Sequence, residues 1–205
     1  MECQVDTRTR IINTAAELFY RHGFESVGLL EICTKAKVSK SSFYHFFSSK
    51  AEVAVAVVKA HWQSGKQILD NILSSSQSPL QKIQAIFADI FSMTESMGCH
   101  HGEDFGCPFG NLASELSNSN PALREQMQFV FDSMMNVFID LIDQAKAEGE
   151  LTETVDSRGT AKALLMSLLG MRLLGKVYND SAEMRRDGEY ALKLILEHKQ
   201  ITPSA

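Results

Sequence analysis

The chain has 205 residues, of which 44% are hydrophobic, so it can bury a sizeable core as one domain or as a small module joined to a larger one. Its formal net charge of −5 excludes a protein that coats nucleic acid through bulk positive charge. The charge is uneven, because residues 1–50 hold seven Lys and Arg against five Asp and Glu, while the rest hold thirteen against twenty. A weakly basic head on an acidic body is compatible with a head that presents one positive face to a partner.

The first two predicted helices lie within residues 9–36. Apolar residues in the first recur at helical spacing and form one buried stripe: Ile11, Ala15, Leu18 and Phe19. Gly23 ends this helix. The second helix, residues 28–36, repeats the pattern: Leu29, Ile32, Cys33 and Ala36. Both helices are therefore amphipathic.

A third short helix follows after only Lys37 and Val38, so it must cross the second at a steep angle. Ser39 is placed to cap it. We expect Phe43, Phe46 and Phe47 to form its buried side. The side chains left on the outer side are then of the kinds that contact DNA grooves and phosphates. The residues predicted to face DNA are Ser39, Lys40, Ser41, Ser42, Tyr44, His45 and Lys50. Lys40 and Lys50 suit phosphates, whereas Ser41, Ser42 and Tyr44 suit base edges, so residues 1–50 predict a DNA-binding helix-turn-helix domain.

This head resembles the tetracycline-repressor (TetR) family of bacterial transcription regulators. The resemblance rests on Thr14-Ala15-Ala16-Glu17-Leu18-Phe19, Gly23-Phe24, Ala36, Val38-Ser39-Lys40, Ser42-Phe43-Tyr44-His45-Phe46-Phe47, Ser49-Lys50 and Glu52. It implies an all-helical homodimer that binds operator DNA through three helices and a small ligand through the rest. Gly28 departs from the pattern, since the family usually places there a Ser or Thr that caps the second helix and touches a phosphate. Either Ser26 substitutes for that residue or the contact is absent.

Residues 51–205 stay helical and are predicted to form a ligand-binding and dimerisation domain. Ser49 and Glu52 make a capping box for a fourth helix that stops before residues 74–78. Pro79 opens a fifth helix, with a loop expected over residues 98–106, and Pro108 opens a sixth. The seventh runs from residue 121 to Gly149, and the last two cover residues 157–178 and 181–198. We thus expect about nine helices and an all-α fold.

The last two helices are unusually apolar for a chain end. In the family, the equivalent pair docks against its twin as a four-helix bundle, and the residues expected at that interface are Leu164, Leu165, Leu168, Leu173, Leu192, Ile195 and Leu196. The alternative is that they complete the core of one chain.

Cys107 is the leading candidate for sensing a signal. It stands where Pro108 begins a helix, and a helix N-terminus favours the thiolate that reacts with quinones, aldehydes or oxidants. Residues 106–113 also resemble a branch of the family that includes repressors sensing reactive electrophiles. Lys176 is expected to approach the same pocket, where burial would make its amine reactive or ion-paired. The apolar residues expected to line this site are Phe91, Phe109, Met134 and Phe138.

Other interpretations of this region stay open. Cys107 could be a small buried cap residue, with Lys176 reaching solvent and the apolar residues only filling a core. A helical thiol enzyme could use Cys107 as nucleophile with His100 or His101 as base, although no catalytic motif supports it. A metal-binding regulator could use Cys99, His100, His101 and Cys107, although they lack the spacing of a closed metal cage.

We therefore predict a DNA-binding transcriptional regulator rather than an enzyme, and a repressor released by an apolar ligand or by thiol modification at Cys107. No cofactor or metal is expected. No apolar stretch follows residues 1–6, so no signal peptide is expected, and the apolar segment at residues 163–174 is broken by Ser167 and Arg172, so no membrane span is expected. The four cysteines have no disulfide-rich spacing, which fits reduced thiols in a cytoplasm.

Overall fold

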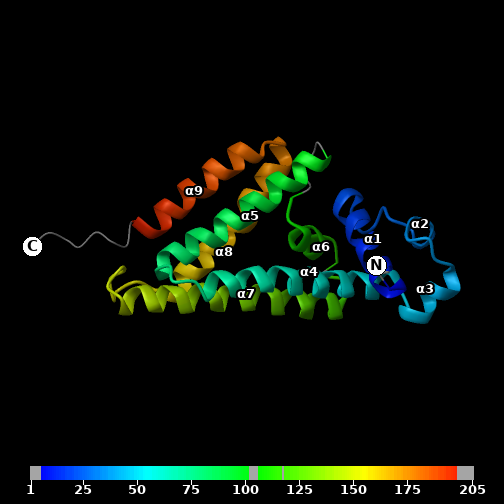
Figure 1. The fold of residues 1–205 in the computed structure, drawn as a ribbon, viewed down its shortest axis with the longest axis horizontal. Helices are drawn as coiled ribbons and strands as arrows, with labels where there is room; N and C mark the ends of the chain where they lie inside the picture. The colour runs from blue at the N-terminus through cyan, green and yellow to red at the C-terminus, as the bar shows by residue number, and fades with distance from the viewer. Residues whose placement is uncertain (1–5, 102–105, 117, 198–205) are drawn as a thin grey trace, which may run out of the picture. The chain divides into compact units, whose positions relative to one another are not determined.

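The computed structural model describes residues 6–101, 106–116 and 118–197, with the backbone alone described for 95–101 and 197. All elements in these ranges are α-helices, which confirms the predicted fold class (Figure 1). Their bounds are α1 Thr7–His22, α2 Leu29–Lys35, α3 Lys40–Phe46, α4 Lys50–Leu73, α5 Pro79–His101, α6 Pro108–Leu116, α7 Pro121–Ala147, α8 Ser157–Tyr178 and α9 Ser181–Glu197. The fifth helix is longer than predicted, because α5 continues through Gly98 instead of ending there.

Polar side chains fix several helix starts. The Asp6 carboxylate accepts a hydrogen bond from the backbone N–H of Thr9 at 3.0 Å, and the Asn120 side chain accepts one from Leu123 at 2.9 Å. At α4 the expected capping box is modified: Ser49 Oγ accepts from the Glu52 N–H, but the Glu52 carboxylate accepts from the N–H and hydroxyl of Ser48. These bonds lower the pKa of Glu52, the backbone N–H of Ser48 having the largest effect. Local sequence signals therefore set where the helices begin.

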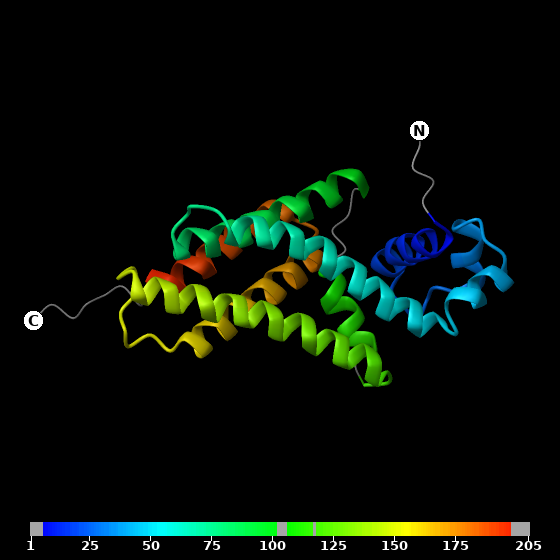
Figure 2. The ribbon, with the colours of Figure 1, turned by 60° about the horizontal axis from the view of Figure 1, so that its bottom comes forward.

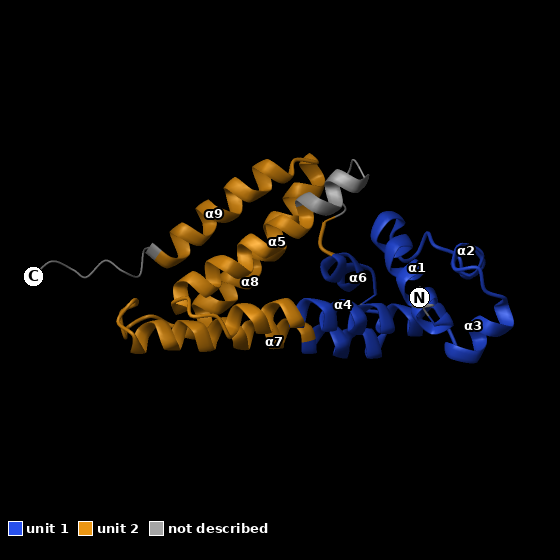
Figure 3. Ribbon diagram, viewed as in Figure 1, with its two compact units in different colours: residues 1–66, 108–129 blue, residues 67–107, 130–205 orange. Residues whose placement is uncertain are grey.

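The helices form two compact units, coloured separately in Figure 3. Unit 1 comprises residues 1–66 and 108–129, and unit 2 comprises residues 67–107 and 130–205. The predicted division at residue 50 differs from this one, since α6 and the first parts of α4 and α7 belong with the helix-turn-helix. Non-local packing groups these segments, and no local sequence signal marks it.

Unit 2 is organised around α5, α8 and α9, and α9 lies alongside both other helices (Figures 1 and 2). The ring of Phe87 lies 6.3 Å from the rings of Phe91 and Phe138, and all three side chains are buried. Gly188 of α9 permits close packing, because a Cβ there would lie 2.4 Å from Phe91 and 2.6 Å from the sulfur of Met171. The core of unit 2 is thus aromatic, and α9 packs closely on α5 and α8 at Gly188.

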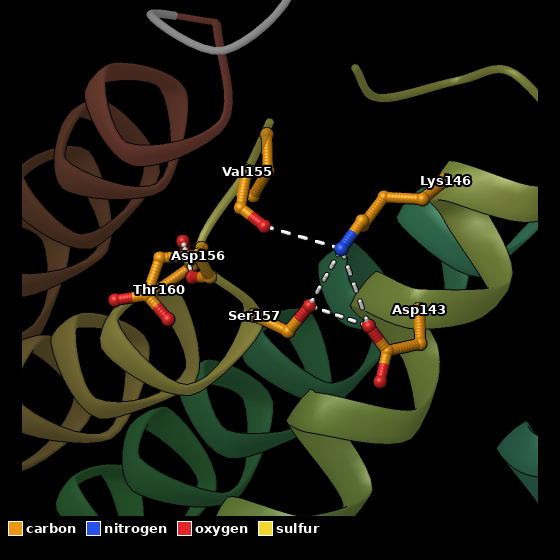
Figure 4. Close-up of polar contacts among 6 residues, drawn as sticks. All are labelled: Asp143, Lys146, Val155, Asp156, Ser157 and Thr160. Carbon is orange, nitrogen blue, oxygen red and sulfur yellow. Dashed lines mark hydrogen bonds and ion pairs between the residues drawn. The ribbon is translucent and has the colours of Figure 1, made fainter. Parts of the chain in front are cut away.

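A polar cluster joins the end of α7 to the start of α8 (Figure 4). The ammonium of Lys146 donates to the carbonyl of Val155 at 3.2 Å and to the hydroxyl of Ser157 at 3.3 Å, and it pairs with Asp143 at 3.6 Å. Ser157 also donates to the Asp143 carboxylate. These contacts of the half-buried Lys146 ammonium are all with residues at the end of α7, at the start of α8 or between them. The cluster therefore has a structural role, which is to hold the connection between α7 and α8.

Candidate nucleic-acid interface and effector region

The α3 helix presents most of its predicted DNA-contacting side chains to solvent. Phe43 is 0% exposed and packs inward, whereas its neighbour Tyr44 is 56% exposed. Lys40, Ser41 and His45 are also exposed. A seven-residue helix with one fully buried aromatic side chain thus directs the rest outward. We call Lys40, Ser41, Tyr44, His45 and Phe46 the α3 face.

Phe46 corrects one expectation, because it is 36% exposed rather than buried. Its ring lies 4.8 Å from that of His45 in an edge-to-face arrangement. Phe43 and Phe47, at 0% and 2% exposed, supply the buried side alone. Helical spacing could not predict the exposure of Phe46, because the helical repeat applies only as far as the end of α3. The helix ends at Phe46, and Phe47 already has extended backbone.

The hydroxyls at the start of α3 are engaged with one another. Ser39 Oγ accepts from the N–H of Ser42 at 3.0 Å, which confirms Ser39 as the cap, and it donates to the hydroxyl of Ser42 at 2.9 Å. Ser41 lies within 2.9 Å of the same oxygen. Ser42 is half-buried and Ser41 is exposed, so Ser41 is the better placed of the two for an outside contact.

Lys50 is placed differently from the other predicted DNA contacts. Its ammonium donates to the backbone carbonyls of Phe24 at 2.7 Å and Val27 at 2.8 Å, and it lies 4.1 Å from the centre of the Phe24 ring. Two of its three donors therefore hold the α1–α2 connection. These contacts assign Lys50 to positioning the head, whereas Lys40 is exposed.

Glu115 of α6 holds the same α1–α2 connection from another side. Its carboxylate accepts from the backbone N–H groups of Phe24 at 2.8 Å and Glu25 at 3.1 Å. Gly23 has φ +79°, and a Cβ there would lie 3.0 Å from the Glu115 carboxylate. The backbone angle therefore favours glycine, and the absence of a Cβ leaves room for the Glu115 carboxylate. Nothing in the local sequence around Glu115 indicated this role.

The start of α2 shows that neither Gly28 nor Ser26 supplies a side-chain cap. Gly28 is the N-cap residue, and no side-chain hydrogen bond caps the helix. Ser26 is exposed and does not take over that bond. The turn between α2 and α3 places Lys37 at φ +53°, in the left-handed region.

Gly106 precedes Cys107 in the chain and lies close to Lys176 of α8. Cys107 is buried, at 9% exposed, and the side-chain carbons of Lys176 would lie 3.0 and 3.3 Å from a Cβ on Gly106. Lys176 is nevertheless exposed, so the burial expected for its amine is wrong. The other described cysteine, Cys33, is also a free thiol, and burial raises its pKa.

The predicted apolar lining is only partly brought together. Phe91 and Phe138 both contact Phe87 in the core of unit 2, and Met134 is half-buried in the same unit. Phe109 belongs to unit 1, where its ring lies 4.8 Å from that of His61. An open groove of about 500 Å³ runs between α5 and α9 and is lined by Leu80, Gln84, Phe87, Ala88, Phe91, Glu189, Leu192, Lys193 and Leu196.

The side chains of Cys99, His100 and His101, named for a metal or thiol-enzyme site, lie outside the described residues. Elsewhere in the described chain, no three His, Cys, Asp or Glu side chains converge on a possible metal site. None of the helices in the described ranges is long and apolar enough to cross a membrane.

Most of the leucines predicted for a dimer interface are buried within their own chain. Leu164, Leu168, Leu192 and Leu196 are 0–7% exposed, and Leu165 and Ile195 are half-buried. Leu173 alone of the seven is well exposed, at 58%. A different set of apolar side chains is exposed on α8 and α9: Met166, Leu173, Leu174, Val177, Tyr190 and Leu194. We call this set the α8–α9 stripe.

Sequence reasoning also missed Arg172, which is 7% exposed in α8. A signal for it was present, because Arg172 follows Leu164 and Leu168 at intervals of four residues and so falls on their buried face. From the sequence, Arg172 was interpreted only as a break in an apolar segment and not as a buried residue on the face of Leu164 and Leu168.

The three-helix head, with its exposed cationic and polar α3 face on an otherwise helical chain, defines a DNA-binding protein of the helix-turn-helix class. Residues 11–57 match the model for bacterial regulatory proteins of the tetR family, and residues 79–189 match the model for tetracyclin repressor-like C-terminal domains. The chain therefore belongs to the TetR family of transcriptional regulators, as its head predicted.

Relatives span nearly the whole chain. The HTH-type transcriptional repressor NemR of Escherichia coli (strain K12) is 31% identical over 84% of this chain and 85% of its own length. An uncharacterised HTH-type regulator of Lactococcus lactis is 28% identical over 85% of this chain and 86% of its own. A solved TetR regulatory protein of Rhodobacter sphaeroides superposes with a TM-score of 0.78 at 28% identity, covering 94% of this chain and 98% of its own.

Proposed function

We propose that the protein is a homodimeric repressor that leaves its operator when an electrophile or small ligand acts at Cys107. The observation that carries this proposal is the position of Cys107 directly before α6, the helix whose Glu115 holds the N–H groups of Phe24 and Glu25. A change at the thiol that shifts or unwinds the start of α6 alters the connection that orients α2 and α3. The similarity to the repressor NemR supports the sign of regulation, and the resemblance of residues 106–113 to the electrophile-sensing branch supports the kind of signal.

The test is binding to the DNA upstream of the protein's own gene, measured by fluorescence anisotropy with and without a quinone. We expect the quinone to release the wild type and Cys33→Ser, while Cys107→Ser stays bound. Cys33 is a matched control, because it is the other described free thiol and its raised pKa disfavours the reactive thiolate. Release of Cys107→Ser to the same extent as wild type would remove Cys107 from the mechanism.

Coupling through α6 has its own test. Glu115→Ala removes the acceptor for two backbone N–H groups and should separate thiol modification from DNA release. We expect mass spectrometry to show unchanged modification of Cys107 in this variant, while quinone lowers its operator affinity less than in wild type. An undiminished response would mean that the signal bypasses Glu115.

For dimerisation we propose the α8–α9 stripe in place of the buried leucines. Met166, Leu173, Leu174 and Val177 follow one face of α8 and are 46–66% exposed. Gly170 lies in the same row, and a Cβ there would meet nothing within 4 Å, so a second helix can approach closely. An exposed apolar face of this kind is typical of a protein–protein interface.

Sedimentation of Leu173→Glu tests this surface, with Leu30→Glu as the control. Both side chains are exposed, at 58% and 61%, but Leu30 lies on α2 of unit 1 and is not part of the stripe. We expect the first variant to sediment as a monomer and the second as a dimer. A dimeric Leu173→Glu protein would exclude the stripe as the interface.

A further inference from the structure

Arg172 is a buried cation with one hydrogen-bond donor that has no partner among the described residues. Its side chain is 7% exposed, and its Nη2 donates to the carbonyl of Gly106 at 3.1 Å. Its Nε is buried and has no hydrogen-bond partner among the described residues. A guanidinium carries five N–H donors and keeps its positive charge. Because an unpaired charge is costly to bury, this geometry calls for an anion.

The unused donor lies beside the segment that carries Cys107. Gly106 has φ +80° and lies directly against α8, since a Cβ there would be 3.0 Å from Lys176 and 3.5 Å from the carbonyl oxygen of Arg172. Cys107 is the next residue and is buried. Arg172, Gly106 and Cys107 thus belong to one part of unit 2, with the Arg172 guanidinium bonded to the residue directly before Cys107.

We propose that Arg172 is the anion-binding residue of an effector site beside Cys107, and that the effector carries a single carboxylate. The role as effector rests on the proposed function, whereas the binding site does not. A planar carboxylate fits the fork formed by Nε and a neighbouring Nη nitrogen. One carboxylate also balances one guanidinium, whereas a phosphate dianion would leave a buried negative charge uncompensated.

Thermal unfolding tests the site without DNA. Propionate is compared with the neutral propionamide at equal ionic strength, for wild type, Arg172→Met and the control Lys176→Met. We expect propionate to raise the Tm of wild type and Lys176→Met only. Without ligand, Arg172→Met should melt above wild type, because an apolar side chain of similar length removes an unpaired buried charge. A wild type indifferent to propionate, or an Arg172→Met protein that responds equally, would overturn the proposal.

Alkylation of Cys107 gives a second readout. Iodoacetate and iodoacetamide react alike, the thiolate sulfur bonding to carbon as iodide leaves, but only iodoacetate carries a carboxylate. Peptide mass spectrometry gives the rate of each reaction at Cys107. We expect the iodoacetate rate divided by the iodoacetamide rate to be about tenfold lower in Arg172→Met than in wild type, since a hydrogen bond to a charged group has that order of effect. Lys176→Met should change the ratio little. Equal ratios in wild type and Arg172→Met would overturn the proposal.

A partner within the chain is the competing explanation. Glu103 and Asp104 precede Gly106 in the sequence and lie outside the described residues. If Arg172→Met melts below wild type, and Glu103→Gln or Asp104→Asn lowers the Tm to the same extent, Arg172 is already paired within the chain and the proposal fails. If propionate binds through Arg172 but leaves operator affinity unchanged, the site stands and the effector role fails.

Discussion

The α3 face and the surroundings of Arg172 both offer positively charged hydrogen-bond donors, but they differ sharply in their exposure to water. Lys40 is exposed on α3, so solvent satisfies its ammonium until a phosphate replaces that solvent. Arg172 is 7% exposed, and its Nε finds no partner among the described residues. An exposed cation suits a large polyanion bound in a salt-dependent way. A buried one selects a small anion that can enter the core.

The same contrast exists at smaller scale inside the head. Phe43 and Tyr44 are neighbours in α3, yet one is fully buried and the other is 56% exposed. Lys40 and Lys50 bracket the same helix, yet Lys50 is bonded to two backbone carbonyls. Adjacent residues therefore divide into those that build the head and those that are free to contact DNA, and paired substitutions can separate the two roles.

The largest effect is expected for Phe43→Ala compared with Tyr44→Ala. Removing the fully buried ring of Phe43 should lower the free energy of unfolding by about 3–5 kcal/mol. Tyr44→Ala should cost about 1 kcal/mol or less, mainly its edge contact with Phe43, while weakening operator binding. Urea unfolding and anisotropy measure the two quantities. Tyr44→Ala with normal affinity would remove Tyr44 from the interface.

Substitution of Lys50 should mainly affect stability, whereas substitution of Lys40 should mainly affect operator binding. Lys50→Met removes the ammonium that donates to the carbonyls of Phe24 and Val27, although Phe24 keeps the Val27 N–H as a donor, so we expect it to lower the free energy of unfolding by about 1–3 kcal/mol. Lys40→Met should leave stability within about 0.5 kcal/mol, weaken operator binding and reduce the salt dependence by about one phosphate contact. If both variants keep their Tm and lose the same salt dependence, Lys50 contacts a phosphate directly.

Acid should weaken the start of α4 through Glu52. Its pKa is lowered by the N–H and the hydroxyl of Ser48, so the carboxylate stabilises the fold at pH values above the ordinary Glu pKa of 4.5. This stabilisation is lost as the pH falls through the lowered pKa. Because Glu52 is exposed, we expect less than about 1 kcal/mol. Thermal unfolding from pH 7 into that acid range should show a smaller loss for Glu52→Gln than for wild type, and equal losses would contradict the assignment.

The smallest effect is expected at the uncapped start of α2. Gly28→Ser adds a hydroxyl that can cap the helix, its Cβ meets nothing within 4 Å, and the extended backbone at φ −84° suits serine. We expect a gain of a few tenths of a kcal/mol, because glycine is itself a fair N-cap. Operator affinity should rise if the new hydroxyl reaches a phosphate. A destabilised variant in urea unfolding would mean that the cap does not form.

The sequence by itself determined the helices, their order and the family. Apolar spacing and caps such as Ser39 act within one turn of chain, so they can be read locally, and they also identified Cys107 and the α3 side chains as candidates. Two local predictions were wrong: the start of the loop after α5 and the burial of Phe46. The predictions of a homodimer, of operator contacts and of an effector at Cys107 stay predictions.

Only the tertiary structure decided which side chains are exposed and which are used in contacts within the fold. Lys50 binds carbonyls more than twenty residues earlier in the chain, and Glu115 holds backbone N–H groups of Phe24 and Glu25 across ninety. Leu164 and Arg172 share a helix face, and only packing against other helices makes that face the core instead of a dimer surface. The physical reason is that burial and polar pairing depend on neighbours remote in sequence, whereas helix formation depends on residues three or four positions away.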